Sequence, residues 1–257
     1  MLAHPLKIVA GLFAAGLLAC APAQAAYGNA TASLDNIKFE LIDLDLTDNI
    51  SPSITFTSTS ASGRLDSYSY FAGVNEKTYS SGFESLDRVF TFGSGSLQNG
   101  PTSMRADLHA SPAPRDLSST VYARQELNFT LSPSTRLLFT AQADAGVEQQ
   151  GMLQSYAIAT LEGYLSSEIN GVYGYEQFMS TLDRRTGSGS EFLRGALDTG
   201  TGVGTGTLSA STYTSFTHFT SAVPEPETYG MLLAGLLVVG GIARRNRRAH
   251  SRQTRQA

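Results

Sequence analysis

The sequence predicts an all-β protein, built as an antiparallel two-sheet sandwich of jelly-roll type. Nine segments between residues 37 and 219 are rich in β-branched and aromatic side chains, which fit a pleated, half-buried surface. Serine, threonine and glycine fill the connections at intervals of about 8 to 15 residues, the spacing typical of a sandwich. Between residues 26 and 222, sustained helical periodicity is missing, and at most one or two helical turns are expected, near residues 175–185.

The N-terminus predicts a cleaved signal peptide over residues 1–25. Lys7 supplies the positive start, residues 8–20 form an apolar run, and Ala23 and Ala25 flank Gln24 in a small-x-small cleavage site. Cleavage after Ala25 by signal peptidase, following passage through the general secretion translocon, makes Ala26 the mature N-terminus. The run is too short for a membrane span, which needs about 20 residues. A lipoprotein signal ending at Cys20 stays open as an alternative.

Cysteine and charge restrict what the mature chain can do. Cys20 is the one cysteine, so its removal with the signal excludes disulfides, thiolate metal sites and a cysteine nucleophile. The passenger, residues 26–222, is long enough for one sizeable domain. It carries 11 basic and 20 acidic residues, a net charge of −9. Because such a surface repels phosphates, no nucleic-acid partner is expected.

The nine expected strands follow one another with recognisable turns. In the first, residues 37–46, alternation places Phe39, Leu41 and Asp43 on one face. The others cover residues 53–57, 65–71, 85–92, 102–109, 121–131, 137–147, 152–166 and 206–219. A Ser-Pro-Ser turn at 132–134 predicts that residues 121–147 form a hairpin. The Gly-Ser runs at 93–96 and 187–190 are interpreted as turns or linkers, and the glycine-rich run at 200–206 as a flexible loop.

The C-terminus has three consecutive parts. A short motif comes first, formed by Val223, Pro224, Glu225 and Pro226. The uncharged residues 228–243 would make a helix of about 24 Å, short for a hydrocarbon core of about 30 Å but able to span it if flanking side chains snorkel. A basic cluster follows, formed by Arg244, Arg245, Arg247 and Arg248, and residues 249–257 make a polar tail. Arginines favour the cytoplasmic side, so the passenger is expected outside.

These C-terminal residues resemble the PEP-CTERM sorting signal of Gram-negative bacteria that make exopolysaccharide. The proline-glutamate-proline motif, the apolar helix and the arginine cluster match in order, spacing and position, over residues 223–248. The resemblance implies an exosortase, a membrane cysteine protease-transpeptidase that cuts near the motif. It also implies an inner-membrane-anchored precursor that passes to the cell surface or extracellular matrix.

One cluster of acids is a weak candidate for calcium. Asp43, Asp45 and Asp48 put carboxylates on a strand and its adjoining turn, and calcium prefers oxygen ligands. The EF-hand pattern is not met, because Thr47 stands where an acid or amide belongs and Asp48 where glycine belongs. A solvated strand edge that discourages aggregation is the alternative interpretation.

Aromatic clusters and histidines are the other candidate site residues. One aromatic cluster comprises Tyr68, Tyr70, Phe71 and Tyr79, and another comprises Tyr156, Tyr164, Tyr173 and Tyr175. Both indicate either carbohydrate contact or cross-strand packing. His109 and His218 are the histidines of the passenger, and they do not form a pair with metal-ligand spacing.

Two functions of different classes follow. The first is an exported structural or adhesive protein of the cell surface or biofilm matrix, associated with exopolysaccharide. The alternative is a secreted hydrolase acting on polysaccharide, or a carbohydrate-binding module. A glycoside hydrolase needs two carboxyl groups about 5 to 9 Å apart, and the sequence has many acids without a pairing to favour. We therefore expect no enzymatic activity, no metal and no cofactor.

Overall fold

The computed structural model describes residues 27–111, 114, 116–150, 153–169, 171–218, 233 and 235–237. The chain divides into two compact units, one of Ala25–Phe219 and one of Met1–Gln24 with Thr220–Ala257. In the second unit, residues 233 and 235–237 are helical. Within the described ranges, no helix has the length and apolar character needed to cross a bilayer. The predicted signal peptide and the rest of the predicted membrane helix lie outside those ranges.

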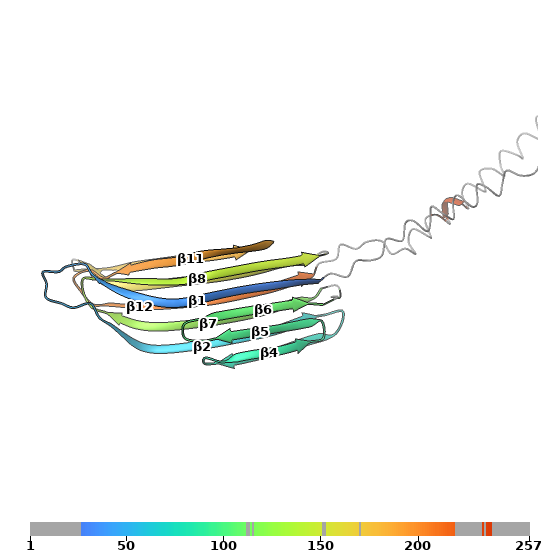
Figure 1. Ribbon diagram of the computed structural model, residues 1–257, viewed down its shortest axis with the longest axis horizontal. Helices are drawn as coiled ribbons and strands as arrows, with labels where there is room; N and C mark the ends of the chain where they lie inside the picture. The colour runs from blue at the N-terminus through green and yellow to red at the C-terminus, as the bar shows by residue number, and fades with distance from the viewer. Residues whose placement is uncertain are drawn as a thin grey trace, which may run out of the picture. The chain divides into compact units, whose positions relative to one another are not determined.

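The first unit is a sandwich of two six-stranded sheets (Figure 1). Sheet A has the order β11 (Gly187–Asp198), β8 (Thr135–Gln150), β1 (Tyr27–Asp43), β6 (Met104–Ala110), β5 (Gly93–Asn99) and β4 (Ser85–Phe90). Sheet B has the order β10 (Val172–Arg184), β9 (Leu153–Ile169), β12 (Gly204–His218), β7 (Ser118–Leu131), β2 (Ile54–Ser69) and β3 (Val74–Ser81). Neighbouring strands are antiparallel, as β1 is to both β8 and β6.

The predicted antiparallel two-sheet sandwich is thus confirmed. The connectivity is more elaborate than a jelly roll, which has eight strands in two Greek keys. Hairpins within one sheet join β2 to β3, β4 to β5, β5 to β6 and β9 to β10, whereas the other connections cross between the sheets. The crossings bring strands that are distant in sequence into register, as β1 and β8 are.

Several strands differ from the sequence prediction. The expected hairpin over residues 121–147 is wrong, because β7 belongs to sheet B and β8 to sheet A. The short connection between them is held by hydrogen bonds from the backbone of Ser132 to Ser53 and of Ser134 to Gly200. The expected helical turns near residues 175–185 are also wrong, since β10 pairs with β9 along its whole length.

The Gly-Ser runs show why small residues misled the prediction. Residues 93–96 and 187–190 were expected to be turns or linkers, but they begin β5 and β11. Neighbouring strands pair with these residues, and the backbone hydrogen bonds of that pairing hold them in the sheet although their side chains are small. Gly93 has a φ of 140°, and a Cβ there would overlap the carbonyl oxygen of His109. Only glycine fits at this position, where the chain leaves the β4–β5 turn.

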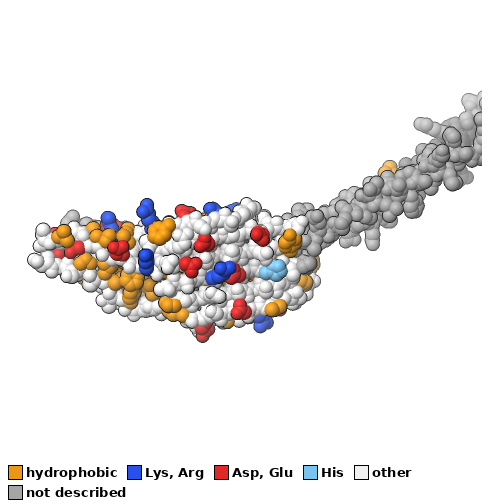
Figure 2. All heavy atoms as spheres, in the orientation of Figure 1, with side chains coloured by type: hydrophobic (Ala, Val, Ile, Leu, Met, Phe, Trp, Pro, Cys, Tyr) orange, Lys and Arg blue, Asp and Glu red, His pale blue; other side chains and the backbone are white. Residues whose placement is uncertain are grey.

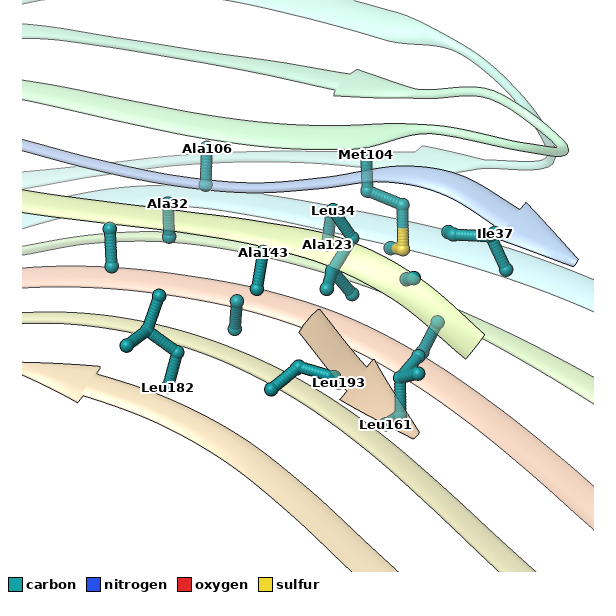
Figure 3. Close-up of a cluster of buried hydrophobic side chains, with 14 of the residues drawn as sticks. Ala32, Leu34, Ile37, Met104, Ala106, Ala123, Ala143, Leu161, Leu182 and Leu193 are labelled. Carbon is teal, nitrogen blue, oxygen red and sulfur yellow. The ribbon is translucent and has the colours of Figure 1, made fainter. Parts of the chain in front are cut away.

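The core between the sheets is made mostly of alanine and leucine. Figure 3 shows Ala32, Leu34, Ala106 and Ala143 of sheet A, and Ala123, Leu161 and Leu182 of sheet B, among the buried side chains. Phe178 of β10 lies between two glycines, Gly163 of β9 and Gly195 of β11, and a Cβ on either glycine would overlap its ring. Phe178 also meets the ring of Phe139 edge to face at 6.4 Å. Aromatic packing therefore joins the two sheets where β10 and β11 approach each other.

Candidate functional site

The residues predicted from the sorting motif and the cleavage site lie outside the described ranges. These are Ala23, Ala25 and Ala26 at the N-terminus, Val223, Pro224, Glu225 and Pro226 of the motif, and Arg244, Arg245, Arg247 and Arg248 of the basic cluster. They stay predictions. The candidate binding surfaces among the described residues belong to the sandwich.

A shallow groove of about 780 Å³ crosses the outer face of sheet A. Every strand of the sheet contributes to its lining. One row of residues paired across the strands forms its middle: Ser188, Gly146, Thr31, Asp107, Ser96 and Asp87. Since neighbouring strands lie about 4.8 Å apart, a six-strand row extends over roughly 24 Å. Most members of the row are small, which explains the hollow.

A second row runs parallel to the first and is displaced from it by two residues along each strand. Its members are Glu148, Asn29, His109, Ser94 and Val89, all of which line the groove. Nδ1 of His109 lies 2.6 Å from Oδ1 of Asn29, in a cross-strand hydrogen bond. The two rows together form a floor of hydroxyl, amide, carboxylate and imidazole groups.

Asp107 orders the centre of this floor. Thr31 Oγ1 donates to Asp107 Oδ1 at 2.6 Å, and Arg105 Nε donates to Asp107 Oδ2 at 2.7 Å. The hydrogen bond to Asp107 raises the pKa of Arg105, whose guanidinium is charged at neutral pH in any case. Both carboxylate oxygens and both partners are therefore held in place before any ligand arrives, which lowers the entropy cost of binding.

The groove presents both polar and apolar surface. Figure 2 views this face of the sandwich, where acidic and basic side chains are interspersed among polar ones. Side chains able to form hydrogen bonds recur at the strand spacing on every strand of the row except β8, where Gly146 stands. Such an arrangement can bind an extended, hydroxyl-rich polymer along the row direction.

The calcium candidates do not converge on one point. Asp43, Asp45 and Asp48 each accept a hydrogen bond from the backbone amide two residues later in the chain. Hydrogen bonds from the side chain and the backbone of Thr47 lower the pKa of Asp45. The described residues contain no group of three His, Cys, Asp or Glu side chains that could hold a metal ion. The three acids act as turn-forming residues, and the geometry lends no support to a calcium site.

Parts of both predicted aromatic clusters come together. Tyr164 and Tyr175 stack at 5.8 Å on the outer face of sheet B, and Tyr173 is exposed. Tyr156 instead contacts Arg185, whose guanidinium carbon lies 4.9 Å from the centroid of the tyrosine ring. In the first cluster, Tyr70 and Phe71 meet edge to face at 5.8 Å in the β2–β3 turn. Aromatic pairing across strands is thus real, and part of it faces solvent.

The β2–β3 turn is held by Asp116. Its carboxylate accepts hydrogen bonds from the Ser69 hydroxyl and from the backbone amides of Tyr70 and Phe71. Burial tends to raise the pKa of Asp116, but these hydrogen bonds together hold it below its usual value. Of the two histidines, His109 lies in the groove, whereas His218 is buried beside the carbonyl oxygen of Pro114.

Sequence reasoning missed nearly all of the groove. His109 was singled out, but for its unsuitability as a metal ligand. Some other members, such as Asp87, Asp107 and Gly146, lie in strands that were expected but were not recognised as site residues. The rest come from segments that looked like turns, such as residues 93–96, or from the start of β1, which lay before the first expected strand. A detectable signal is the alternation of small polar with small apolar residues, as in Asn29-Ala30-Thr31-Ala32-Ser33.

Comparison with known families identifies the C-terminal segment. Residues 222–248 match the PEP-CTERM protein-sorting motif. The chain is a PEP-CTERM sorting domain-containing protein, as the sequence resemblance implied. The motif implies that an exosortase sorts the chain as an exported protein, through a membrane-anchored precursor. Comparison with curated proteins gives no significant match.

Proposed function

We propose that this protein is a non-enzymatic structural or adhesive component of the cell surface or biofilm matrix that holds exopolysaccharide in the groove of sheet A. The sorting motif supports delivery to the outside, because it implies an exported chain. Once the chain has been exported, the role of the sandwich is to bind the exopolysaccharide.

The observation that carries the proposal is the in-register row across all six strands of sheet A, in which every member except Gly146 has a polar side chain. A polysaccharide presents hydroxyl groups at regular intervals, and the row presents donors and acceptors at the strand interval. The central network of Thr31, Asp107 and Arg105 is already hydrogen-bonded, so binding does not need to order it.

A polysaccharide hydrolase is the second candidate, because Asp87, Asp107 and Glu148 all line this groove. A glycosidase needs one carboxyl group free to protonate the leaving oxygen and a second that acts as base or nucleophile. Asp107 is committed to Thr31 and Arg105, which favours binding over catalysis. Release of reducing ends from hydroxyethylcellulose would instead support the hydrolase.

Filling the groove tests the proposal. Ser96→Trp places an indole in the row between Asp107 and Asp87, whereas Gln98→Trp places one on the same face of β5, outside the groove lining. Both positions point outward, so both variants should fold. In affinity electrophoresis through gels containing hydroxyethylcellulose, a neutral polysaccharide, Ser96→Trp should bind about tenfold more weakly, as expected for a blocked contact centre. Gln98→Trp should migrate as the wild type does.

Equal retardation of both variants would refute the groove as the binding surface. Lack of retardation of the wild-type protein in gels with hydroxyethylcellulose, chitosan or alginate would refute polysaccharide binding altogether. In cells, Ser96→Trp should be exported and processed normally but recovered in the medium, while the wild type stays in the matrix fraction. Retention of both in the matrix would show that the groove does not anchor the protein there.

A further inference from the structure

The outer face of sheet B has a hollow of its own, on the opposite side of the sandwich from the groove. Its volume is about 520 Å³. Two cross-strand rows form it, Gln177–Tyr164–Thr207 and Met179–Glu162–Ser209, contributed by β10, β9 and β12. Arg124 of β7 closes one side. The central strand β12 supplies only small hydroxyl side chains, so the hollow lies over it.

An aromatic platform borders this hollow. Tyr164 lines it and stacks on Tyr175, with ring centroids 5.8 Å apart and planes 27° from parallel. Tyr175 is 71% exposed and Tyr164 is 42% exposed, so the pair is not buried in a core. Exposed, rigid aromatic rings next to polar groups are typical of sites where a flat, partly apolar ligand face stacks.

Polar groups stand beside the platform to orient such a ligand. Thr207 Oγ1 donates to Asn128 at 2.7 Å, and Arg124 Nη2 donates to Glu126 at 3.0 Å, which fixes both side chains. Arg124 Nε is buried and has no hydrogen-bond partner within the described part of the chain. Thr207 and Arg124 both line the hollow, so a ligand there meets a hydroxyl and a guanidinium group that are already held in position.

We propose that the sheet B hollow is a second polysaccharide site, in which a sugar ring stacks on Tyr164 and Tyr175, and that the protein thereby cross-links two polysaccharide chains. The hollow and the groove belong to opposite outer faces of one sandwich, so one chain cannot occupy both without wrapping around its edge. Cross-linking rests on the proposed function, because it needs the groove of sheet A. The second site does not.

The charge of the passenger selects the class of polysaccharide. Its net charge is −9, from 11 basic and 20 acidic residues. A polyuronate would be repelled by this field at low ionic strength. At the sites themselves the charges nearly balance, because Arg124 stands with Glu162 in the hollow and Arg88 and Arg105 stand with three acids in the groove. This field disfavours a polyuronate, and the proposal commits to a neutral polysaccharide, which the field neither attracts nor repels.

Stoichiometry separates the two sites. In titration calorimetry with the neutral hexasaccharides cellohexaose, maltohexaose and mannohexaose, each tested alone, the wild type should bind two equivalents of at least one of them. The double variant Tyr164→Ala/Tyr175→Ala should bind one equivalent, and so should Ser96→Trp. Tyr213→Ala is the matched control, because Tyr213 faces outward from the same sheet, pairs edge to face with Tyr122 and does not line the hollow. It should keep two equivalents.

Cross-linking is read separately, by light scattering of hydroxyethylcellulose mixed with the protein. Wild type and Tyr213→Ala should raise the scattering, and either single-face variant should abolish at least nine-tenths of that rise, since avidity requires both sites. One equivalent that is lost in Ser96→Trp but kept in the double tyrosine variant would overturn the second site and leave the proposed function intact. One equivalent with the reverse pattern would overturn the groove and with it the cross-linking. Binding of none of the three sugars would overturn both.

Discussion

The two outer faces of the sandwich have the same backbone design but different side chains. Each face carries in-register rows in which serine, threonine or glycine of the central strands leaves a depression. On sheet A the depression is surrounded by charged groups and is not bordered by aromatic rings among its lining residues. On sheet B it is bordered by stacked tyrosines. The chemistry of a ligand therefore depends on what surrounds the small residues, since the depressions themselves arise in the same way.

This comparison teaches how a β-sandwich can acquire a site without loops. Neither depression needs a long connection, because both are built from positions that point outward along the strands. Register alone places Thr31 beside Asp107 and Tyr164 beside Thr207. A change of a single outward side chain can alter one face and leave the other untouched, since opposite faces share only the core.

The largest expected effect is a loss of stability in the core, which should disturb both outer faces because both are built on it. Gly195→Val would drive a branched side chain into Phe178, which already fills the space between Gly163 and Gly195. Overpacking of this kind costs about 3 kcal/mol. Urea unfolding should show that loss, together with weaker binding at both sites.

Ala196→Val is the matched control, since Ala196 is the next residue of β11 and is exposed. Its free energy of unfolding should change by less than about 0.5 kcal/mol. Adding Phe178→Ala to Gly195→Val should recover part of the lost stability, because the overlap disappears. Equal stability of the Gly195 and Ala196 variants would show that Phe178 does not join the sheets in this way.

A smaller effect should be confined to sheet A. Asp107→Ala removes the acceptor of both Thr31 and Arg105, so these two side chains lose their fixed positions in the groove floor. Binding to hydroxyethylcellulose should weaken about fivefold to tenfold, which corresponds to about 1 kcal/mol, the net contribution typical of one hydrogen bond. Affinity electrophoresis measures it, and scattering due to cross-linking should fall with it.

Asp144→Ala controls for the loss of a carboxylate from the same face. Asp144 accepts a hydrogen bond from Ser190 and does not line the groove. Its removal should leave binding unchanged within a factor of two. A similar loss in both variants would mean that overall charge, and no particular contact, controls the affinity of this face.

The fold class could be predicted because it depends on composition and alternation, but strand pairing could not. β4, β7, β8, β9 and β12 lie where alternating residues placed them. The assumption that β7 and β8 form a hairpin failed because a Ser-Pro-Ser turn fits a crossing between sheets as well as a hairpin. The choice is made by hydrogen bonds to Ser53 and Gly200, which are far away in sequence.

The candidate sites could be predicted only where a single residue type is diagnostic. Tyr164 and Tyr175 were recognised because aromatic residues are uncommon and large, and they do stack. Members of the groove such as Ser96 and Gly146 carry no signal alone, since they matter only in a row that long-range pairing creates. The prediction that residues 93–96 form a turn or linker failed for the same reason. Their pairing with β6 makes them part of an inner strand, and that pairing cannot be recognised from the neighbouring sequence.

The smallest expected effect concerns a carboxylate on the sheet B face that, unlike Asp107, is incompletely paired. Asp66 lies 2.9 Å from Arg64 and opposite Lys77, but its Oδ1 is buried without a hydrogen-bond partner in the described part of the chain. Burial raises the pKa of Asp66 above 3.8, against the attraction of Arg64 and Lys77. The folded state therefore holds the proton more tightly than the unfolded state, and stability decreases as the pH rises above that value.

Asp66→Asn should be slightly more stable than the wild type at pH 7, by less than about 0.5 kcal/mol after screening. In thermal unfolding, this advantage should shrink as the pH is lowered to 3. A variant less stable than the wild type at pH 7 would show instead that the ion pair outweighs the burial.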